Sequence, residues 1–442
     1  MSFSHYQEYK ESGHDWLGSI PRSWSIGKFR HLFSESSEKI EKEVYGEMLS
    51  VSGYRGIEVK QYSDENQKRT EENLVGYRIV HADQLVVNTM WLNYAGLGIS
   101  QLEGHVSPAY RCYWIDPSLH KPFVHYLMRS GLYVLGYTKY LTGVRPNSLQ
   151  MGRDDLMSFP ILIPSLEEQN IIAIFLDQET VKIDRLIAEQ EKLISLLNEK
   201  RLTVISDAVT RGINPGSKLK NSNVNWLGEV PEHWEIVPLK RLCSLLKDGT
   251  HLPPARVDEG IPLLSVRNLQ DSTFGLLDDD SFISEESYAD LSRSFIPQEN
   301  DVLLAIVGGT IGKTALVPKD LGSFHIQRSL AIFRTKPNLL PTWLWRSFQS
   351  TGFQSLLWEY VGFSAQPGIY LGTLSEFKIP LPPIEEQIQI LKAIEPELNK
   401  IDTLIEESRT AVSLLIEYRS GLISSAVTGQ IDVRSYKNKE VA

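Results

Sequence analysis

The sequence predicts an α+β protein with an internal pseudo-twofold repeat, in which two α/β domains are separated by an antiparallel pair of long, coiled-coil-like helices. The pattern Trp-Leu-Gly-x-x-Pro-x-x-Trp occurs at residues 16–24 and again at 226–234. A Glu-Glu-Gln triplet followed by a long amphipathic stretch occurs at 167–169 and again at 385–387. A chain of 442 residues exceeds what one hydrophobic core usually organises. A period of roughly 210 to 220 residues leaves room for one domain and one helix in each copy.

The two globular domains are expected at residues 1–160 and 225–380. Within the first, short alternating runs such as 84–88 are separated by Gly, Asn and Pro, which is typical of strands joined by turns. The second follows the same plan after the repeated Trp motif. Large aromatics in a duplicated motif suit packing, so Trp16, Trp24, Trp226 and Trp234 are expected to anchor the start of each domain.

The long helices are expected at residues 165–211 and 384–430. Ser165 and Glu168 have the spacing of a capping box at the first helix start. Apolar residues then recur at alternating steps of three and four, as in a coiled-coil seam, and the second helix repeats them. Two such stripes can be buried by packing on each other. The remaining segments are a predicted linker at 212–224 and a predicted polar tail at 431–442.

Composition narrows the class of protein. A hydrophobic share of 42% and a charged share of 23% are those of an ordinary soluble globular protein. Cys112 and Cys243 are the two cysteines, too few and too isolated for a disulfide framework or a zinc site. No leader-like or membrane-spanning run is apparent, so a cytoplasmic protein without a membrane partner is expected. A net charge of −10 disfavours non-specific coating of nucleic acid, but it leaves room for local reading of a groove.

The duplicated motifs resemble those of the specificity subunits of type I restriction-modification systems. The resemblance rests on the Trp motif, on Ile/Leu-Pro-x-x-Glu-Glu-Gln at the start of each helix, and on Ile-Ser-x-Ala-Val-Thr at 205–210 and 423–428. It implies that each domain is a target-recognition domain that reads one half of a bipartite sequence in double-stranded DNA. It also implies that the helices set the spacer and dock two methyltransferase subunits, to which restriction subunits can be added. No cofactor is then expected in this chain, because S-adenosylmethionine, ATP and Mg belong to the partner subunits.

No catalytic residue and no metal ligand is predicted in the chain itself. Residues 308–314 look like a phosphate-binding loop, but that loop needs a glycine where Val307 stands. A DNA-facing loop with Lys313 on a phosphate, or an ordinary hairpin, remain the alternatives there. The run 107–110 resembles the motif with which adenine methyltransferases grip a flipped base, but it lacks the second proline.

DNA contacts are predicted at loop positions that carry side chains suited to base edges and phosphates. In the first domain these are Arg55, Asn88, Trp91, Asn93, Tyr94, Lys139, Arg145 and Asn147. In the second domain they are Lys247, Thr250, His251, Arg267, Asn268, Lys313, Arg328, Tyr360 and Gln366. The acidic residues Glu167, Glu168, Glu385 and Glu386 are expected to stabilise the first helical turns, with partner docking as the alternative.

Two other functions are compatible with the sequence. The chain could be a structural scaffold whose domains bind proteins, in which case exposed apolar patches would be expected at the domain tips. It could also be an autonomous DNA-modifying enzyme, which would turn over without partners.

Overall fold

The computed structural model describes residues 3–53, 56–62, 71–143, 149–252, 254–270, 273–362 and 367–436. The chain divides into two compact units. Unit 1 comprises residues 1–190 and 410–442, and unit 2 comprises residues 191–409. Two long helices, α5 (Leu166–Arg211) and α11 (Ile384–Val427), each contribute one part to unit 1 and another to unit 2. Among the described residues, every helix is too short or too polar to span a lipid bilayer.

Unit 1 is built on two four-stranded sheets. One sheet has the order β4-β11-β8-β9 and is antiparallel throughout, and the other has the order β6-β5-β10-β7 with one parallel pair, β5 with β10. The strands are β1 (Tyr9–Glu11), β2 (Ser19–Pro21), β3 (Ser25–Lys28), β4 (Phe33–Glu35), β5 (Glu47–Ser52), β6 (Gly56–Val59), β7 (Arg78–Val80), β8 (Leu85–Asn88), β9 (Leu97–Ile99), β10 (Gly104–Val106), β11 (Tyr110–Ile115), β12 (Leu141–Thr142), β13 (Gln150–Met151) and β14 (Pro160–Ile163). The shorter helices are α1 (Phe29–Leu32), α2 (Lys121–Arg129), α3 (Gly131–Thr138), α4 (Arg153–Ser158) and the 3-10 turns η2 (Glu71–Leu74) and η3 (Leu92–Tyr94).

Unit 2 repeats this plan. Its antiparallel sheet β18-β26-β23-β24 matches the first sheet of unit 1 strand for strand, and its second sheet, β22-β19-β25, again has a parallel pair, β19 with β25. The strands are β15 (Leu219–Asn221), β16 (Glu229–Pro231), β17 (Glu235–Pro238), β18 (Cys243–Asp248), β19 (Ile261–Leu264), β20 (Leu269–Gln270), β21 (Thr273–Phe274), β22 (Phe282–Ile283), β23 (Val302–Ala305), β24 (Thr314–Leu316), β25 (His325–Ile326), β26 (Leu330–Thr335) and β27 (Lys378–Leu381). The shorter helices are α6 (Leu239–Leu242), η5 (Val266–Asn268), α7 (Glu285–Ser292), α8 (Pro341–Gln349), α9 (Thr351–Glu359) and α10 (Leu371–Ser375). The predicted mixed α and β composition is confirmed.

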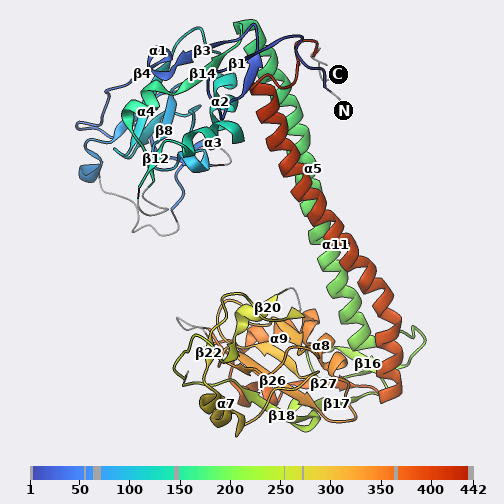
Figure 1. Ribbon diagram of the computed structural model, residues 1–442. Helices are drawn as coiled ribbons and strands as arrows, with labels where there is room; N and C mark the ends of the chain where they lie inside the picture. Colours follow the sequence, from blue (N-terminus) through green and yellow to red (C-terminus); the bar gives the residue numbers. More distant parts are fainter. Residues whose placement is uncertain are drawn as a thin grey trace. The chain divides into compact units, whose positions relative to one another are not determined.

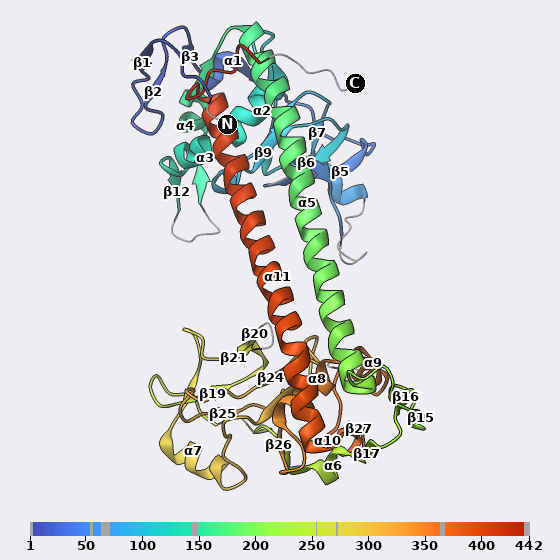
Figure 2. The ribbon, with the colours of Figure 1, turned by 90° about the vertical axis from the view of Figure 1, so that its right-hand side faces the viewer.

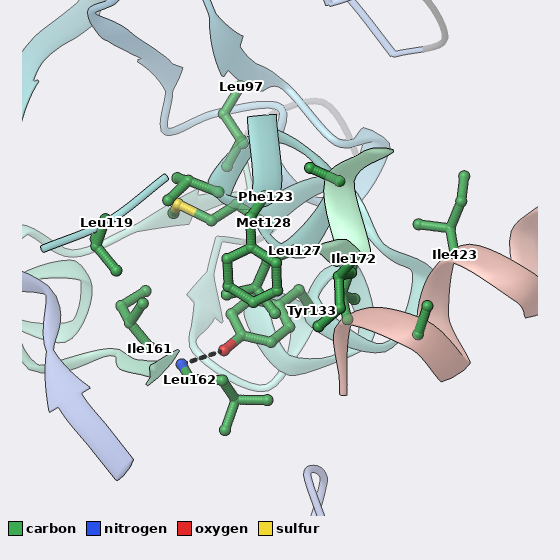
Figure 3. Close-up of a cluster of buried hydrophobic side chains, with 14 of the residues drawn as sticks. Leu97, Leu119, Phe123, Leu127, Met128, Tyr133, Ile161, Leu162, Ile172 and Ile423 are labelled. Atoms are coloured by element: carbon green, nitrogen blue, oxygen red, sulfur yellow. Dashed lines mark hydrogen bonds between the residues drawn. The ribbon is translucent and has the colours of Figure 1, made fainter. Parts of the chain in front are cut away.

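The core of unit 1 joins the helices to the sheet. Phe123, Leu127 and Tyr133 from α2 and α3 are fully buried beside β14, and the Tyr133 hydroxyl accepts a hydrogen bond from the Leu162 backbone N–H at 3.1 Å (Figure 3). The end of α11 belongs to the same core through residues 422–427. In both ribbon views the start of α5 and the end of α11 lie side by side (Figures 1 and 2). Burying these apolar side chains is the main stabilising term for the unit.

An ion pair joins α5 to α11 inside each unit. In unit 1 the Arg419 guanidinium donates to the Asp184 carboxylate at 2.8 Å. In unit 2 the Arg201 guanidinium donates to the Asp402 carboxylate at 2.7 Å, and only 15% of the Arg201 side chain is exposed. Such partly buried pairs fix register more than they stabilise, because desolvation offsets much of the attraction.

A buried glutamine at the start of each long helix performs the same task twice. The Gln169 side chain donates to the carbonyls of residues 118 and 164 and accepts from the N–H of residue 120. The Gln387 side chain donates to the carbonyls of residues 338 and 382 and accepts from the N–H of residue 340. Each amide thereby ties the helix start to the turn that precedes α2 or α8, which explains why Glu-Glu-Gln is duplicated.

Two of the four neighbouring glutamates, Glu168 and Glu386, are engaged in contacts within their own unit. Ser165 caps the helix, with its hydroxyl accepting from the Glu168 N–H at 3.3 Å, but the Glu168 carboxylate accepts from the Tyr6 hydroxyl at 2.6 Å. The Glu386 carboxylate accepts from the Trp234 indole N–H at 3.1 Å. Glu167 and Glu385, in contrast, are exposed in the first turns, where acidic side chains favour the helix dipole.

The four tryptophans pack as anchors, closely against glycines. A Cβ on Gly136 would lie 2.8 Å from the Trp16 ring, and one on Gly352 would lie 2.9 Å from the Trp226 ring. Trp24 and Trp234 are buried. The tryptophans therefore position the start of each domain, as expected from the repeated motif.

The segments expected to be a linker and a tail are partly structured. In the linker range, β15 pairs with β16, which repeats the β1–β2 pairing of unit 1 and lies beside the end of α5 (Figure 2). In the tail range, Val433 is buried and the Tyr436 ring meets the Phe175 ring at 4.9 Å. The chain start also bonds there, because the Asp432 N–H donates to the Ser4 carbonyl at 2.7 Å. Helix α11 ends at Val427, three residues before the expected limit, because Gly429 adopts a left-handed φ of 71°.

Candidate nucleic-acid interface

The β8–β9 connection of unit 1, residues 89–96, presents two aromatic rings to solvent. Trp91 and Tyr94 are each 57% exposed, and their ring centroids lie 5.6 Å apart. Leu92 is fully buried between them and fixes the turn to the core. We call residues 85–99 the unit 1 hairpin. Exposed aromatic rings on a fixed turn suit stacking on bases or sugars.

The conformation of the unit 1 hairpin depends on small residues. Ala95 has a left-handed φ of 53°, and the Gly96 N–H donates to the Trp91 carbonyl at 2.8 Å. A Cβ on Gly96 would lie 2.5 Å from that carbonyl oxygen, so no other residue fits. The Asn88 side-chain oxygen accepts from the Met90 N–H at 3.2 Å and starts the turn.

One arginine of α2 supports the unit 1 hairpin through hydrogen bonds to its backbone. Arg129, the last residue of α2, donates through Nη1 to the carbonyls of Ala95 and Leu97 and through Nη2 to those of Ser52 and Gly53, the last at 2.7 Å. Burial, and after it the nearby charge of Arg419, lower the pKa of this guanidinium to about 10. The group stays protonated at neutral pH. It therefore fixes two loops of unit 1 with one buried cation.

A histidine on the same face of α2 completes this support. His125 accepts at Nδ1 from the Ile99 N–H at 3.3 Å. Burial, and then the charge of Arg129, lower the pKa of His125 to about 4. A neutral imidazole is thus maintained beneath the hairpin.

The equivalent connection in unit 2, residues 306–313, carries different chemistry. It joins β23 to β24, so a strand follows the glycine-rich run where a phosphate-binding loop requires a helix. Gly308 and Gly312 adopt left-handed φ values of 88° and 93°. The Gln354 amide of α9 donates to the Gly312 carbonyl at 2.9 Å. We call residues 302–316 the unit 2 hairpin. Because a strand and not a helix follows its glycines, it is not a nucleotide-binding loop.

Two of the predicted DNA contacts of unit 2 meet at one pocket. Arg267 and Lys313, contributed by η5 and the unit 2 hairpin, line a cavity of about 370 Å³ together with Gln270 and Thr310. Arg267 also forms an ion pair with Asp279. The pocket has two cations and two neutral polar side chains on its wall, a set that suits a phosphate or a base edge.

The remaining predicted residues of unit 2 lie elsewhere in the unit. Thr250 and Arg328 are joined by a backbone hydrogen bond of 3.2 Å at the end of β18. His251 is beside them and bonds the Asp248 carboxylate at 2.6 Å, while Lys247 is exposed on β18. Tyr360, at the end of α9, is exposed and contacts the Phe377 ring edge-on.

Two predicted asparagines have internal roles instead. Asn268 is 2% exposed, and its amide donates to the Gly275 carbonyl and the Asp280 carboxylate while accepting from the Ser265 N–H. The Asn268 amide therefore holds its own loop, and its contact with DNA stays a prediction. Asn88 is likewise buried and starts the unit 1 turn.

The remaining predicted residues of unit 1 include one partly buried and one exposed side chain. Asn93 lies in η3 with its side-chain oxygen buried and without a hydrogen-bond partner among the described residues. Lys139 is exposed at the end of α3, which packs against η3. The predictions for Arg55, Arg145, Asn147 and Gln366 lie outside the described residues.

The structure also brings together residues that sequence reasoning missed. Glu35 of β4 is surrounded by Arg78, Arg111 and Arg153, which lie far apart in the sequence. A cavity of about 160 Å³ adjoins them and reaches Thr89 and Met90 of the unit 1 hairpin region. No motif or spacing marks this group. Elsewhere among the described residues, no group of three or more His, Cys, Asp or Glu could hold a metal ion.

Sequence comparisons find similarity to the specificity subunits of type I restriction enzymes. Residues 231–412 match the family model of the type I restriction modification DNA specificity domain. The chain is 28% identical over 281 residues to the type I restriction enzyme MjaVIII specificity subunit of Methanocaldococcus jannaschii, covering 62% of this chain and 63% of that protein. It is 26% identical over 307 residues to the EcoBI specificity subunit of Escherichia coli, covering 66% and 64%. The chain thus spans a little under two thirds of the length of these relatives.

The fold has a solved counterpart. A chain from a structural study of complex assembly and conformational transition of the type I R-M system superposes with a TM-score of 0.66 at 15% identity, covering 93% of this chain and 99% of that chain. Family model, curated relatives and fold therefore agree with the duplicated motifs. The resemblance of the chain to the specificity subunits of type I restriction-modification systems is therefore confirmed.

Proposed function

We propose that the chain is the DNA-recognition subunit of a type I restriction-modification enzyme, with each unit reading one half of a bipartite target in double-stranded DNA. The observation that carries the proposal is that one scaffold presents two different reading surfaces. The same strand order supports the unit 1 hairpin and the unit 2 hairpin, yet one carries exposed aromatic rings and the other glycines and a lysine. Two domains with the same strand order but different hairpin side chains suit two half-sites of different sequence.

The two tips favour different contacts with DNA. In unit 1, Trp91 and Tyr94 offer flat apolar faces, which suit stacking and contact with a thymine methyl group. In unit 2, Lys313 and Arg267 offer charge to phosphates or to guanine. Lys139 and Arg328 are exposed cations that add to the phosphate contacts.

The long helices are proposed to set the spacer between half-sites and to dock two methyltransferase subunits. Helix α5 has 46 residues, which corresponds to about 69 Å at 1.5 Å per residue. The ion pairs Asp184–Arg419 and Arg201–Asp402 have the sequence order expected for an antiparallel helix pair. Exposed apolar residues on α5 and α11 offer contact area to partners. Methylation of adenine with S-adenosylmethionine, and any ATP- and Mg-dependent cleavage, are assigned to partner subunits in the cytoplasm, and this chain is proposed to be non-catalytic.

Paired substitutions in the two hairpins test the proposal. The chain is co-purified with its methyltransferase subunits, and methylation is measured on duplexes that carry the genomic target or changes in either half. Trp91→Ala is expected to lower methylation and to abolish discrimination in one half only, whereas Lys313→Ala affects the other half. Trp114→Ala, an exposed aromatic of unit 1 outside the hairpin, is the control.

Two results would overturn the proposal. Equal loss of discrimination in both halves for each variant would show that the units do not read separately. Methylation by the purified chain without partners would show that the chain is itself an enzyme.

A further inference from the structure

One carboxylate in unit 1 receives three guanidinium groups. Arg111 and Arg78 approach Glu35 Oε1 at 3.3 and 3.4 Å, and Arg153 donates to Glu35 Oε2 at 2.9 Å. Arg78 is almost fully buried and also donates to the Ser36 carbonyl. The cluster therefore carries two positive charges in excess. An excess of this kind beside a cavity is suited to an electron-rich ligand.

The exposed parts of the cluster face the cavity of about 160 Å³ described above, which we call the Glu35 pocket. Its wall is mixed. Met90, Pro108 and Leu156 contribute apolar surface, and Thr89 and Gln150 contribute neutral polar atoms. Other residues at the wall are Ala109, Arg111, Tyr113, Met151 and Arg153.

The Glu35 pocket is continuous with the unit 1 hairpin. Thr89 and Met90 directly precede Trp91, and the Met151 N–H donates to the Thr89 carbonyl at 3.2 Å. The Gln150 amide donates to the Thr89 hydroxyl at 3.4 Å. A DNA strand that contacts Trp91 would therefore pass the mouth of the pocket.

We propose that the Glu35 pocket reads the major-groove edge of one guanine, with Arg153 donating to O6 and N7. This inference rests on the proposed DNA-recognition function. Guanine presents two acceptors on that edge, and arginine is the side chain that matches both. A phosphate would need only the cations, whereas the neutral polar side chains of Thr89 and Gln150 beside them suit the edge of a base.

Within the cluster, Arg153 is the reading group and Glu35 is a positioning residue. The Arg153 side chain is 71% exposed and uses one nitrogen on Glu35, while Arg111 is 42% exposed. Binding one nitrogen to a carboxylate orients the planar fork and leaves the remaining N–H groups for a base. Arg111 and Arg78 hold Glu35 in place through their ion pairs.

The test uses the chain in complex with its methyltransferase subunits and the duplex that carries its mapped target. Each guanine in the half-site read by unit 1 is replaced in turn by 7-deazaguanine, which lacks N7, and binding is measured by titration. We expect one position at which the unaltered complex binds less tightly after replacement. Arg153→Ala should weaken binding to the unmodified duplex roughly 5- to 150-fold and should be insensitive to replacement at that position. Glu35→Gln should show an intermediate loss and reduced sensitivity at the same position.

Arg22→Ala is the matched control, because the Arg22 side chain is also 71% exposed and makes one ion pair, at 3.0 Å to Glu8. It should bind like the unaltered chain. The inference is wrong if Arg153→Ala remains as sensitive as the unaltered complex at every guanine, or if the half-site contains no guanine. If the unaltered complex does not prefer its target to a scrambled duplex, the proposed function itself fails.

Discussion

Replacing Arg129 by methionine removes the cation that holds the unit 1 hairpin from behind. Four backbone carbonyls lose a charge-assisted hydrogen bond, and such bonds contribute about 1.5–3 kcal/mol each. The full sum is not expected, because burying the guanidinium costs free energy and the freed carbonyls near the surface regain water. We therefore expect the free energy of unfolding of unit 1 to fall by about 2–4 kcal/mol. For a unit of this size that corresponds to a decrease in Tm of roughly 5–15 °C.

The loss should be local in the native state and visible by hydrogen exchange. Amides of residues 89–97 and 52–53 should exchange faster in Arg129→Met, while those of 306–313 in unit 2 should not change. Arg346→Met is the matched control. Burial also lowers the pKa of Arg346 to about 10, but its guanidinium contacts the Trp345 ring and the Gln349 side chain. Unchanged exchange at residues 89–97 in a folded Arg129→Met protein would refute the assignment of Arg129 as the support of the hairpin.

Three further substitutions probe the repeat, the second hairpin and the pH response. Gln169→Leu and Gln387→Leu each leave backbone N–H and C=O groups at one helix start without a hydrogen-bond partner. Each should therefore lower the free energy of unfolding of its own unit by about 2–4 kcal/mol in chemical denaturation. An effect of either substitution on both units would contradict the independence of the two contacts. Gly312→Ala places a Cβ 2.1 Å from the Gln354 side-chain oxygen at a φ of 93°, so it should lower the free energy of unfolding by about 1–2 kcal/mol. Gly309→Ala, whose Cβ would have no atom within 4 Å, should leave stability nearly unchanged. Equal effects of the two substitutions in thermal melts would count against a strained turn at Gly312. The pKa of His125 is lowered to about 4 in the folded state, so the unfolded chain takes up the proton at higher pH than the folded chain. The free energy of unfolding should therefore fall by up to about 3 kcal/mol as the pH drops from 6.5 to 4. His125→Asn should lack this part of the pH dependence in denaturation curves, and an unaltered dependence would rule out the role of His125.

Local sequence patterns predicted the parts of the fold that depend on local physics. The capping-box spacing of Ser165 and Glu168 is visible in the sequence, and α5 begins at Leu166, within one residue of the predicted limit. The duplicated tryptophans also indicated anchoring, since large aromatics in a repeated motif must meet a repeated surface. Gly136 and Gly352 provide that surface in the two units.

The parts that were missed depend on contacts between distant residues. Glu35 meets Arg153 across 118 positions and Arg111 across 76, and no periodicity links a strand end to a helix so far along the chain. The expected polar tail is packed because it meets the chain start, with Ser4 and Asp432 bonded across 428 positions. Residue type alone also does not decide the role of a loop asparagine, which can read a base or, like Asn268, hold its own loop.

Exchanging one reading domain tests whether each unit reads its own half of the target. In the exchanged chain, residues 235–381 of unit 2, from β17 to β27, are replaced by residues 25–163 of unit 1, from β3 to β14. The DNA methylome of cells that express the chain with its methyltransferase subunits is then sequenced for both versions. We expect the second half-site to disappear and the first half-site to occur twice, inverted, with an unchanged spacer. Methylation of the original target by the exchanged chain, or a spacer that changes with the reader, would contradict it.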